Sequence, residues 1–207
     1  MIDGRQKTSN ERGFTIVELL VSSLIFSLIL LVVTIGIIQI SRVYYKGITE
    51  STTQNTARSI VDTIGQAIQF NGGTVSTTLS PAPGTWSSFC VGGQQFSYRL
   101  GYQLVEGTPG SNQTTKALLQ TPLAGCSGNP AAATSGRELL GTKMRISKLS
   151  VTSVGANMYK VSIRIVYGDD DLLNNPTANN ASCKGATAGS QFCSISELTT
   201  TVVKRVQ

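Results

Sequence analysis

Histidine is absent from this 207-residue chain, and charged residues make up only 14% of it. Without imidazole, the chain lacks the commonest general acid–base group and the commonest metal ligand. It also contains no Gly-x-Ser-x-Gly motif, no phosphate-binding loop and no dinucleotide fingerprint. We therefore predict that the protein is not an enzyme and that it carries no cofactor.

Charge is also missing from residues 19–41, and proline is missing from the first 80 residues. Such an uninterrupted apolar stretch is long enough to cross the roughly 30 Å hydrocarbon core of a bilayer as one helix. We therefore predict a transmembrane helix over residues 14–41. Glu18 lies where inserting a carboxylate costs about 2.5–3.5 kcal/mol, so we expect this residue to have a function.

Two ordinary explanations of an apolar N-terminal segment fit this stretch less well. A secretory signal peptide has an apolar region of about 7–15 residues, followed by a small-residue cleavage site. The stretch here is longer, and Gln39-Ile40-Ser41-Arg42-Val43 follows without an Ala-x-Ala pattern. An uncleaved single-span anchor on a monomeric domain is the other alternative, but it gives Glu18 no role.

Gly13-Phe14-Thr15-Ile16-Val17-Glu18 stands directly at the start of this apolar segment. The hexapeptide resembles the processing site of type IV prepilins and of the pseudopilins of type II secretion systems. The resemblance implies that a membrane-bound aspartyl prepilin peptidase, which is also the N-methyltransferase, cuts after Gly13 and methylates Phe14. Residues 1–13 would then be a cleaved leader peptide, and Glu18 would be the assembly glutamate.

A free α-amine on Phe14 gives Glu18 a partner of opposite charge. The two residues are four apart, which is one helical turn, so both charges lie at the same depth in the membrane. Helices packed with an offset of one subunit can pair the amine of one subunit with Glu18 of its neighbour. The partners implied are the lipid bilayer, other pilin subunits, the peptidase and the inner-membrane assembly platform.

The segment after the membrane helix is amphipathic and predicts that the same helix continues over residues 42–70. Polar side chains such as Arg58, Asp62 and Gln66 separate apolar residues that recur at spacings of three and four. Asn71-Gly72-Gly73 then ends the helix. The apolar residues form a stripe that should pack on a globular domain: Ala57, Ile60, Val61, Ile64, Ala67 and Ile68.

Residues 71–207 predict a globular, β-rich head domain. Met158–Tyr167 and Lys143–Val154 should form a hairpin about Gly155-Ala156-Asn157, with a long polar loop at Gly168–Phe192. An amphipathic helix beside an antiparallel sheet gives an α+β fold, as pilins have. The size and layout resemble larger minor pilins and J-type pseudopilins. The other predicted strands are Phe89–Val91, Gln95–Val105, Lys116–Gln120 and Ile195–Val206, and the other predicted loops are Thr74–Ser88 and Thr121–Gly136.

Four cysteines, Cys90, Cys126, Cys183 and Cys193, all follow the membrane segment. A head domain outside the cytoplasm would place them where disulfides persist. Of the three pairings that four cysteines allow, we prefer Cys90–Cys126 with Cys183–Cys193, because the last two are close in sequence. A zinc site is the alternative, but the chain has neither Cys-x-x-Cys nor histidine.

Two clusters of charge in the head are candidate binding sites. Asp169, Asp170 and Asp171 offer oxygen ligands for calcium, although adjacent carboxylates also suit a solvated turn. The basic residues of the predicted hairpin can align on one strand face and contact DNA phosphates, or can simply be solvated. These basic residues are Lys143, Arg145, Lys160 and Arg164.

Taken with the resemblance, these features predict a structural subunit, either a minor pilin or a pseudopilin, that polymerises through its N-terminal helix. Such a subunit is a single-pass membrane protein before assembly, with its head outside the cytoplasm. After assembly it belongs to a pilus (fimbrium) or to a periplasmic or cell-surface pseudopilus that serves protein secretion. The alternative is a competence or tip pilin whose head binds DNA or a surface.

Overall fold

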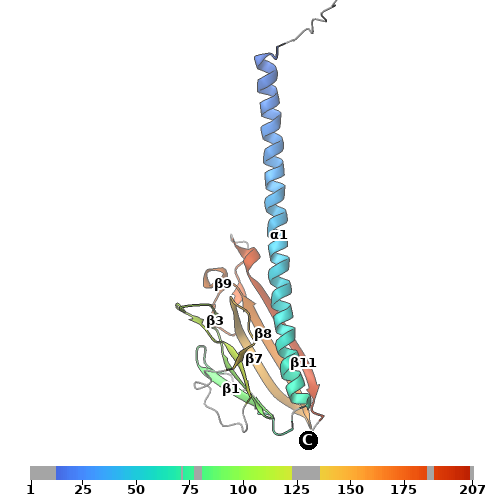
Figure 1. Cartoon of the computed structure of the whole chain (residues 1–207), viewed down its shortest axis with the longest axis vertical. Coiled ribbons are helices and arrows are strands. Elements are labelled where there is room, and N and C mark those ends of the chain that lie inside the picture. Colours follow the sequence, from blue (N-terminus) through green and yellow to red (C-terminus); the bar gives the residue numbers. More distant parts are fainter. Residues whose placement is uncertain (1–12, 71, 77–80, 123–135, 186–188, 206–207) are drawn as a thin grey trace, which may run out of the picture. The chain divides into compact units, whose positions relative to one another are not determined.

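The computed structural model describes residues 13–70, 72–76, 81–122, 136–185 and 189–205 (Figure 1). The helix α1 spans Ile16–Phe70, as predicted except that Phe14 and Thr15 precede it. The chain divides into two compact units, of which the first ends at Arg42 and the second begins at Val43. The helix α1 therefore contributes to both units.

The first unit is an apolar helix whose side chains are uncovered. Every described residue up to Arg42 is exposed except Gly36 and Ser41, which are half-exposed. By length and composition this part of α1 can cross a membrane. The hydroxyls of Ser23, Ser27, Thr34 and Ser41 donate to carbonyls three or four residues earlier, so these polar groups are satisfied within the helix, as lipid requires.

In the second unit, α1 turns one face toward the head. The predicted apolar stripe is buried, while Arg58, Asp62 and Gln66 are exposed, so that the amphipathic interpretation is confirmed. The buried face also includes residues that the apolar pattern does not contain. These additional residues are Thr49, Thr53 and Gly65.

Two antiparallel sheets carry most of the head (Figure 1). The first has the order β1-β2-β5-β6, and the second has the order β11-β8-β7. The strands of the first sheet are β1 (Trp86–Val91), β2 (Gln94–Arg99), β5 (Leu118–Pro122) and β6 (Arg137–Glu138). The strands of the second are β7 (Met144–Gly155), β8 (Met158–Tyr167) and β11 (Ser194–Val203).

The remaining strands are two residues long and lie in the loops. Parallel pairing joins β3 (Gln103–Leu104) to β4 (Gln113–Thr114), and antiparallel pairing joins β9 (Leu173–Asn174) to β10 (Ser182–Cys183). The long loop predicted after β8 therefore has structure of its own. It also contains two 3-10 turns, η2 (Asp170–Leu172) and η3 (Ser190–Phe192).

One hydrophobic core joins the head half of α1 to both sheets. Ile60, Ile64 and Ile68 of the helix pack in the same cluster as residues of β1, β2, β7 and β8. Within this core the rings of Phe89 and Phe96 stack with their centroids 5.0 Å apart. The predicted α+β fold, with a long helix packed on antiparallel sheet, is therefore confirmed.

The prediction of one strand over Gln95–Val105 is wrong. The chain turns at Gly101, whose φ of +79° suits glycine, and a Cβ there would lie 2.6 Å from the Thr177 carbonyl oxygen. Strand β2 therefore stops at Arg99. Gln95 and Ser97 are buried as well as Phe96, so β2 is covered on both faces, although its sequence alternates like that of a half-buried strand.

Other boundaries differ by a few residues. Strand β1 begins inside the predicted Thr74–Ser88 loop, β5 is shifted by two residues from Lys116–Gln120, and β11 begins one residue early. The β7–β8 hairpin is confirmed, and Asn157 takes a left-handed φ of +61° in its turn. The last strand ends at Val203, before the predicted end at Val206, because Lys204 and Arg205 are not in the strand. Val206 itself lies outside the described residues, as does most of the Thr121–Gly136 loop.

Candidate processing and assembly site

The start of α1 is held by reciprocal hydrogen bonds between Thr15 and Glu18. The Thr15 hydroxyl oxygen accepts the Glu18 N–H at 3.3 Å, and the Glu18 carboxylate Oε2 accepts the Thr15 N–H at 3.1 Å. The Thr15 hydroxyl also donates to the same Oε2 at 2.9 Å. This pattern is a capping box, in which the residue before the helix and the third helical residue satisfy each other's backbone N–H groups.

The predicted cleavage point lies just outside this cap. Gly13 and Phe14 are described but belong to no helix, and the Phe14 side chain is 82% exposed. Apart from the chain neighbours of Gly13, no heavy atom of the described residues lies within 4 Å of the position that a Cβ on Gly13 would occupy. The structure therefore leaves the Gly13–Phe14 peptide bond open to another protein.

Sequence reasoning identified Glu18 but missed Thr15. The signal was present, because Thr15-x-x-Glu18 directly precedes an apolar run, which is the pattern of a capping box. The carboxylate has two oxygens, and only Oε2 is taken up by Thr15. The other oxygen, Oε1, accepts no hydrogen bond within the described part of the chain, so it is available to a cation from elsewhere.

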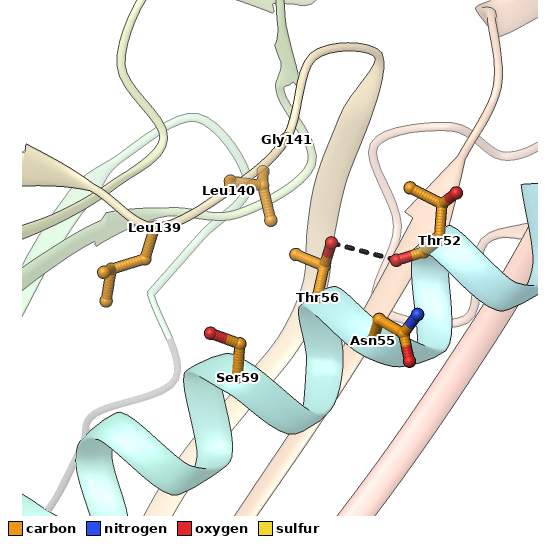
Figure 2. A pocket seen from close by; sticks show the side chains of 7 residues that line it. All are labelled: Thr52, Asn55, Thr56, Ser59, Leu139, Leu140 and Gly141. Atoms are coloured by element: carbon orange, nitrogen blue, oxygen red, sulfur yellow. Dashed lines mark hydrogen bonds between the residues drawn. The ribbon is translucent and has the colours of Figure 1, made fainter.

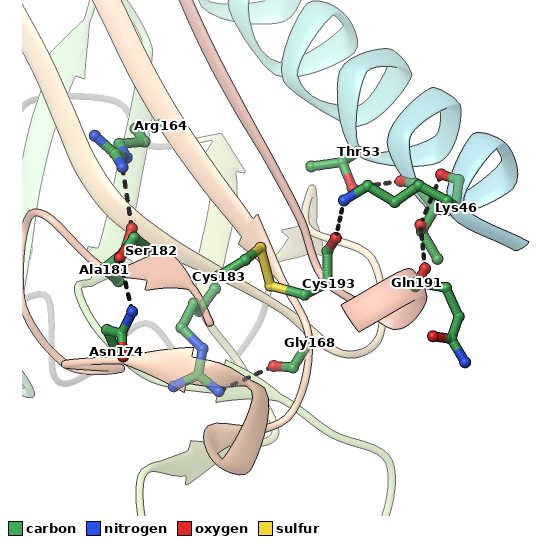
Figure 3. The surroundings of a disulfide bond; sticks show 12 residues. Lys46, Thr53, Arg164, Gly168, Asn174, Ala181, Ser182, Cys183, Gln191 and Cys193 are labelled. Carbon is green, nitrogen blue, oxygen red and sulfur yellow. Dashed lines mark hydrogen bonds between the residues drawn. A yellow bond between two sulfur atoms is a disulfide. The ribbon is translucent and has the colours of Figure 1, made fainter. Parts of the chain in front are cut away.

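The predicted disulfide between Cys183 and Cys193 is present, with Cα atoms 5.8 Å apart (Figure 3). It joins β10 to the residue before β11. The Cys193 carbonyl accepts the Lys46 ammonium at 2.6 Å, and the Gln191 carbonyl accepts the Thr49 hydroxyl at 3.1 Å. The disulfide thus lies beside the point where the head fastens to residues 46–49 of α1. The other predicted pair, Cys90–Cys126, includes Cys126, which lies outside the described residues and keeps this pairing a prediction.

The acidic loop does not gather its three carboxylates around one point. Among the described residues, no group of three or more His, Cys, Asp or Glu side chains is placed to hold a metal ion. The Asp169 carboxylate instead accepts the Gln103 amide at 2.8 Å, and Asp170 accepts the Asn112 amide at 3.1 Å. Asp171 is exposed.

The predicted basic face of the hairpin does not form, because Arg145 is completely buried. Its guanidinium lies 2.5 Å from a carboxylate oxygen of Asp170 and donates to the Gly168 carbonyl at 3.2 Å. Arg145 therefore ties the loop after β8 to β7 and faces no solvent. Arg145 pairs with Val166, so it does lie on the strand face of Lys160 and Arg164, but the loop after β8 covers that end of the face.

The remaining basic residues of that set have partners or stand apart. Lys143 pairs with Asp169 at 3.4 Å, and Arg164 lies 3.5 Å from Glu197. Only Lys160 of the four is exposed with no ion pair in the described chain. The structure therefore shows no cluster of cations on this hairpin that would attract a nucleic acid backbone.

A solvent-open groove of about 420 Å³ lies between α1 and the segment before β7 (Figure 2). Its helical wall bears short polar side chains, one of which, Thr56, donates its hydroxyl to the Thr52 carbonyl at 3.0 Å. No charged side chain lines it. The lining residues are Thr52, Asn55, Thr56, Ser59, Leu139, Leu140 and Gly141.

Comparison with known protein families identifies the N-terminal segment. The model of the prokaryotic N-terminal methylation motif matches residues 8–34, which include Gly13, Phe14 and Glu18. The chain therefore carries a prokaryotic N-terminal methylation motif, which is consistent with the resemblance to type IV prepilins and pseudopilins. No curated protein and no solved structure matches the chain. The finer resemblance to larger minor pilins and J-type pseudopilins stays a prediction.

Proposed function

We propose that this protein is a structural subunit, a minor pilin or pseudopilin, of a type IV pilus-like filament. A prepilin peptidase removes residues 1–13, and the mature chain polymerises through α1. The observation that carries the proposal is the methylation motif, which overlaps the start of a helix whose residues up to Arg42 are largely apolar and uncovered. The role is structural, and this chain is the substrate of the peptidase, which acts at Gly13–Phe14.

The uncovered apolar surface supports both proposed states of the subunit, the membrane-bound state and the assembled state. Large apolar side chains along this helix, such as Phe26, Leu31 and Ile40, are 58–72% exposed. Each would gain about 1.5–3 kcal/mol from burial, so the surface cannot stand in water. Lipid covers it before assembly, and the helices of neighbouring subunits cover it in the filament.

Processing supplies the charge that Glu18 needs. Hydrolysis adds water across the Gly13–Phe14 bond, so the leader leaves with a carboxylate and Phe14 gains an α-amine. A methyl group on this nitrogen leaves its positive charge in place. The Glu18 oxygen that Thr15 does not use then accepts the amine of a neighbouring subunit, which offsets the desolvation of both charges.

Mass spectrometry of the N-terminus tests the proposal. Protein isolated from membranes or filaments should begin at Phe14 and carry one N-methyl group. Gly13→Ile should retain the leader, because a branched side chain then stands at the cleaved bond, whereas Gly4→Ile within the leader should be processed normally. A wild-type chain that keeps Met1 in the assembled state would contradict the proposal.

A further inference from the structure

We infer that Thr15 is a positioning residue for processing. With Glu18 it closes a capping box that starts α1 at Ile16 and so keeps the Gly13–Phe14 bond outside the helix. The inference rests on the proposed function, because it concerns the bond that the peptidase cleaves. It assigns Thr15, which lies within the matched methylation motif, a physical role that the motif match alone does not give.

The hydrogen bonds define the helix start to the residue. The Leu19 N–H donates to the Thr15 carbonyl at 3.2 Å, which is the first bond of the helix and places Thr15 at the position just before it. The Thr15 side chain and the Glu18 side chain then satisfy the backbone N–H groups of Glu18 and Thr15. A start at any other residue would lose these bonds.

The membrane makes this cap more important than it is in water. The first N–H groups of any helix lack partners within the helix, and water normally hydrates them. Beside a hydrocarbon core, hydration is poor and an unpaired N–H is strongly unfavourable. The box therefore restricts the helix to one start, two residues after the predicted mature N-terminus.

A peptidase needs the scissile peptide outside a helix. Within a helix the peptide N–H and C=O are bonded along the axis, and the next turn shields the bond; exposed irregular chain is the preferred substrate of proteolysis. Gly13 and Phe14 meet this requirement here, because both are exposed and neither is helical. The cap thus presents the bond to the enzyme.

Loss of the cap should have a direction. Without the Thr15 hydroxyl, the bonds that place the start of α1 at Ile16 are lost, and an earlier start competes better. A helix that takes in Phe14 would cover the Gly13–Phe14 bond, so we expect slower cleavage.

The carboxylate of Glu18 can be separated from its capping role. Glutamine serves in a capping box as glutamate does, because its side-chain oxygen can accept the same N–H. It carries no charge, however, and cannot pair with the Phe14 amine. Glu18→Gln should therefore be processed normally but assemble poorly, whereas a Thr15 variant should be defective at processing itself.

Full-length chain in phospholipid vesicles, mixed with purified prepilin peptidase, provides the test, with leader release followed by mass spectrometry. Thr15→Val keeps the shape of the side chain but loses the hydroxyl, and kcat/KM should fall about fivefold, the usual effect of a lost cap on helix-start populations. Thr15→Ser and Glu18→Gln should stay within about twofold of wild type.

A second measurement reads the helix start directly. Amide hydrogen exchange of the vesicle-bound chain should show the Phe14 amide more protected in Thr15→Val than in wild type, and unchanged in Thr15→Ser. Normal cleavage of Thr15→Val, or equal slowing by Thr15→Ser, would overturn the inference. An uncleaved wild-type chain would instead overturn the proposed function.

Discussion

The two halves of α1 belong to one helix but differ in whether their apolar side chains are buried within the chain. From Ile16 to Arg42 the helix is largely apolar and its residues stay uncovered, whereas farther along the helix the apolar stripe from Ala57 to Ile68 is buried. Nothing in the described part of the chain covers the first half, and under the proposed function lipid or other subunits would cover it. The second half obtains burial from its own chain.

The largest expected effect comes from a charge placed in the buried stripe. In a chain beginning at Val43, Ile64→Asp puts an unpaired carboxylate at a fully buried site and should cost about 4 kcal/mol or more, enough to unfold the head. Asp62→Ala, two residues away on the exposed side, should change the melting temperature little. Equal melting of the two variants would show that the second half is not held by the head.

Glu18→Ala tests the role of the first half of the helix in assembly. Insertion should be unchanged or improved, because a carboxylate is removed from the apolar segment. Assembly should weaken by about 3 kcal/mol, since the neighbour's amine is left unpaired in a medium of low dielectric. Filament incorporation can be compared with that of Glu50→Ala, which removes an exposed carboxylate from the head half. Loss of assembly in both variants would argue against a specific pairing role.

A smaller effect is expected where the head fastens to the helix. Replacing Cys183 and Cys193 by serine removes a constraint worth about 2–3 kcal/mol and should loosen the turn that holds Lys46 and Thr49. Amide exchange should rise at residues 46–53 and stay unchanged in the stripe around Ile64. Uniform acceleration along the whole second half would mean that the disulfide supports the entire head.

The smallest effect concerns the pH dependence of the head alone. Burial raises the pKa of the Glu138 carboxyl above its ordinary value of 4.5, although N–H bonds from Ala117 and Leu118 partly offset this. A raised carboxyl pKa favours the protonated form in the folded state, so its stabilisation is present below pH 4.5 and is lost as pH rises through the folded pKa.

Thermal melts across this pH range check the sign. Glu138→Gln should flatten the decline in the melting temperature, while Glu106→Gln, at an exposed site, should leave it unchanged. Assembly through the first half of α1 should not respond to either variant. A wild-type head whose stability rises across this range would show that the backbone N–H bonds outweigh the burial of Glu138.

Local sequence patterns were sufficient to predict those elements whose structure depends on residues close in sequence. The helix was predictable because its apolar spacing changes from continuous to periodic near Arg42, and the hairpin was predictable because Asn157 suits a left-handed turn. The capping box could also have been predicted from the spacing of Thr15 and Glu18. Glu18 was singled out only because a carboxylate in the apolar segment costs free energy. These features depend on neighbours within a few residues.

Where contacts between distant segments decide the structure, predictions from local sequence patterns were wrong. The alternation from Phe96 to Leu104 indicated one strand, but the approach of Thr177 to Gly101 ends it. Arg145 looked like a surface cation, yet the loop after β8 returns over β7 and supplies Asp170 and backbone carbonyls as partners. No local signal marks either contact, because the partners lie more than 20 residues away in sequence.

By itself, the sequence determined the processing motif, the membrane-length helix, its buried stripe and the Cys183–Cys193 pair, because periodicity, charge cost and short spacing act locally. Only the tertiary structure decided which cations and carboxylates face solvent and where the strands break. A charge such as Arg145 can be buried only where a folded loop brings partners to it. The cost of desolvating the charge is offset only when those partners are all in place.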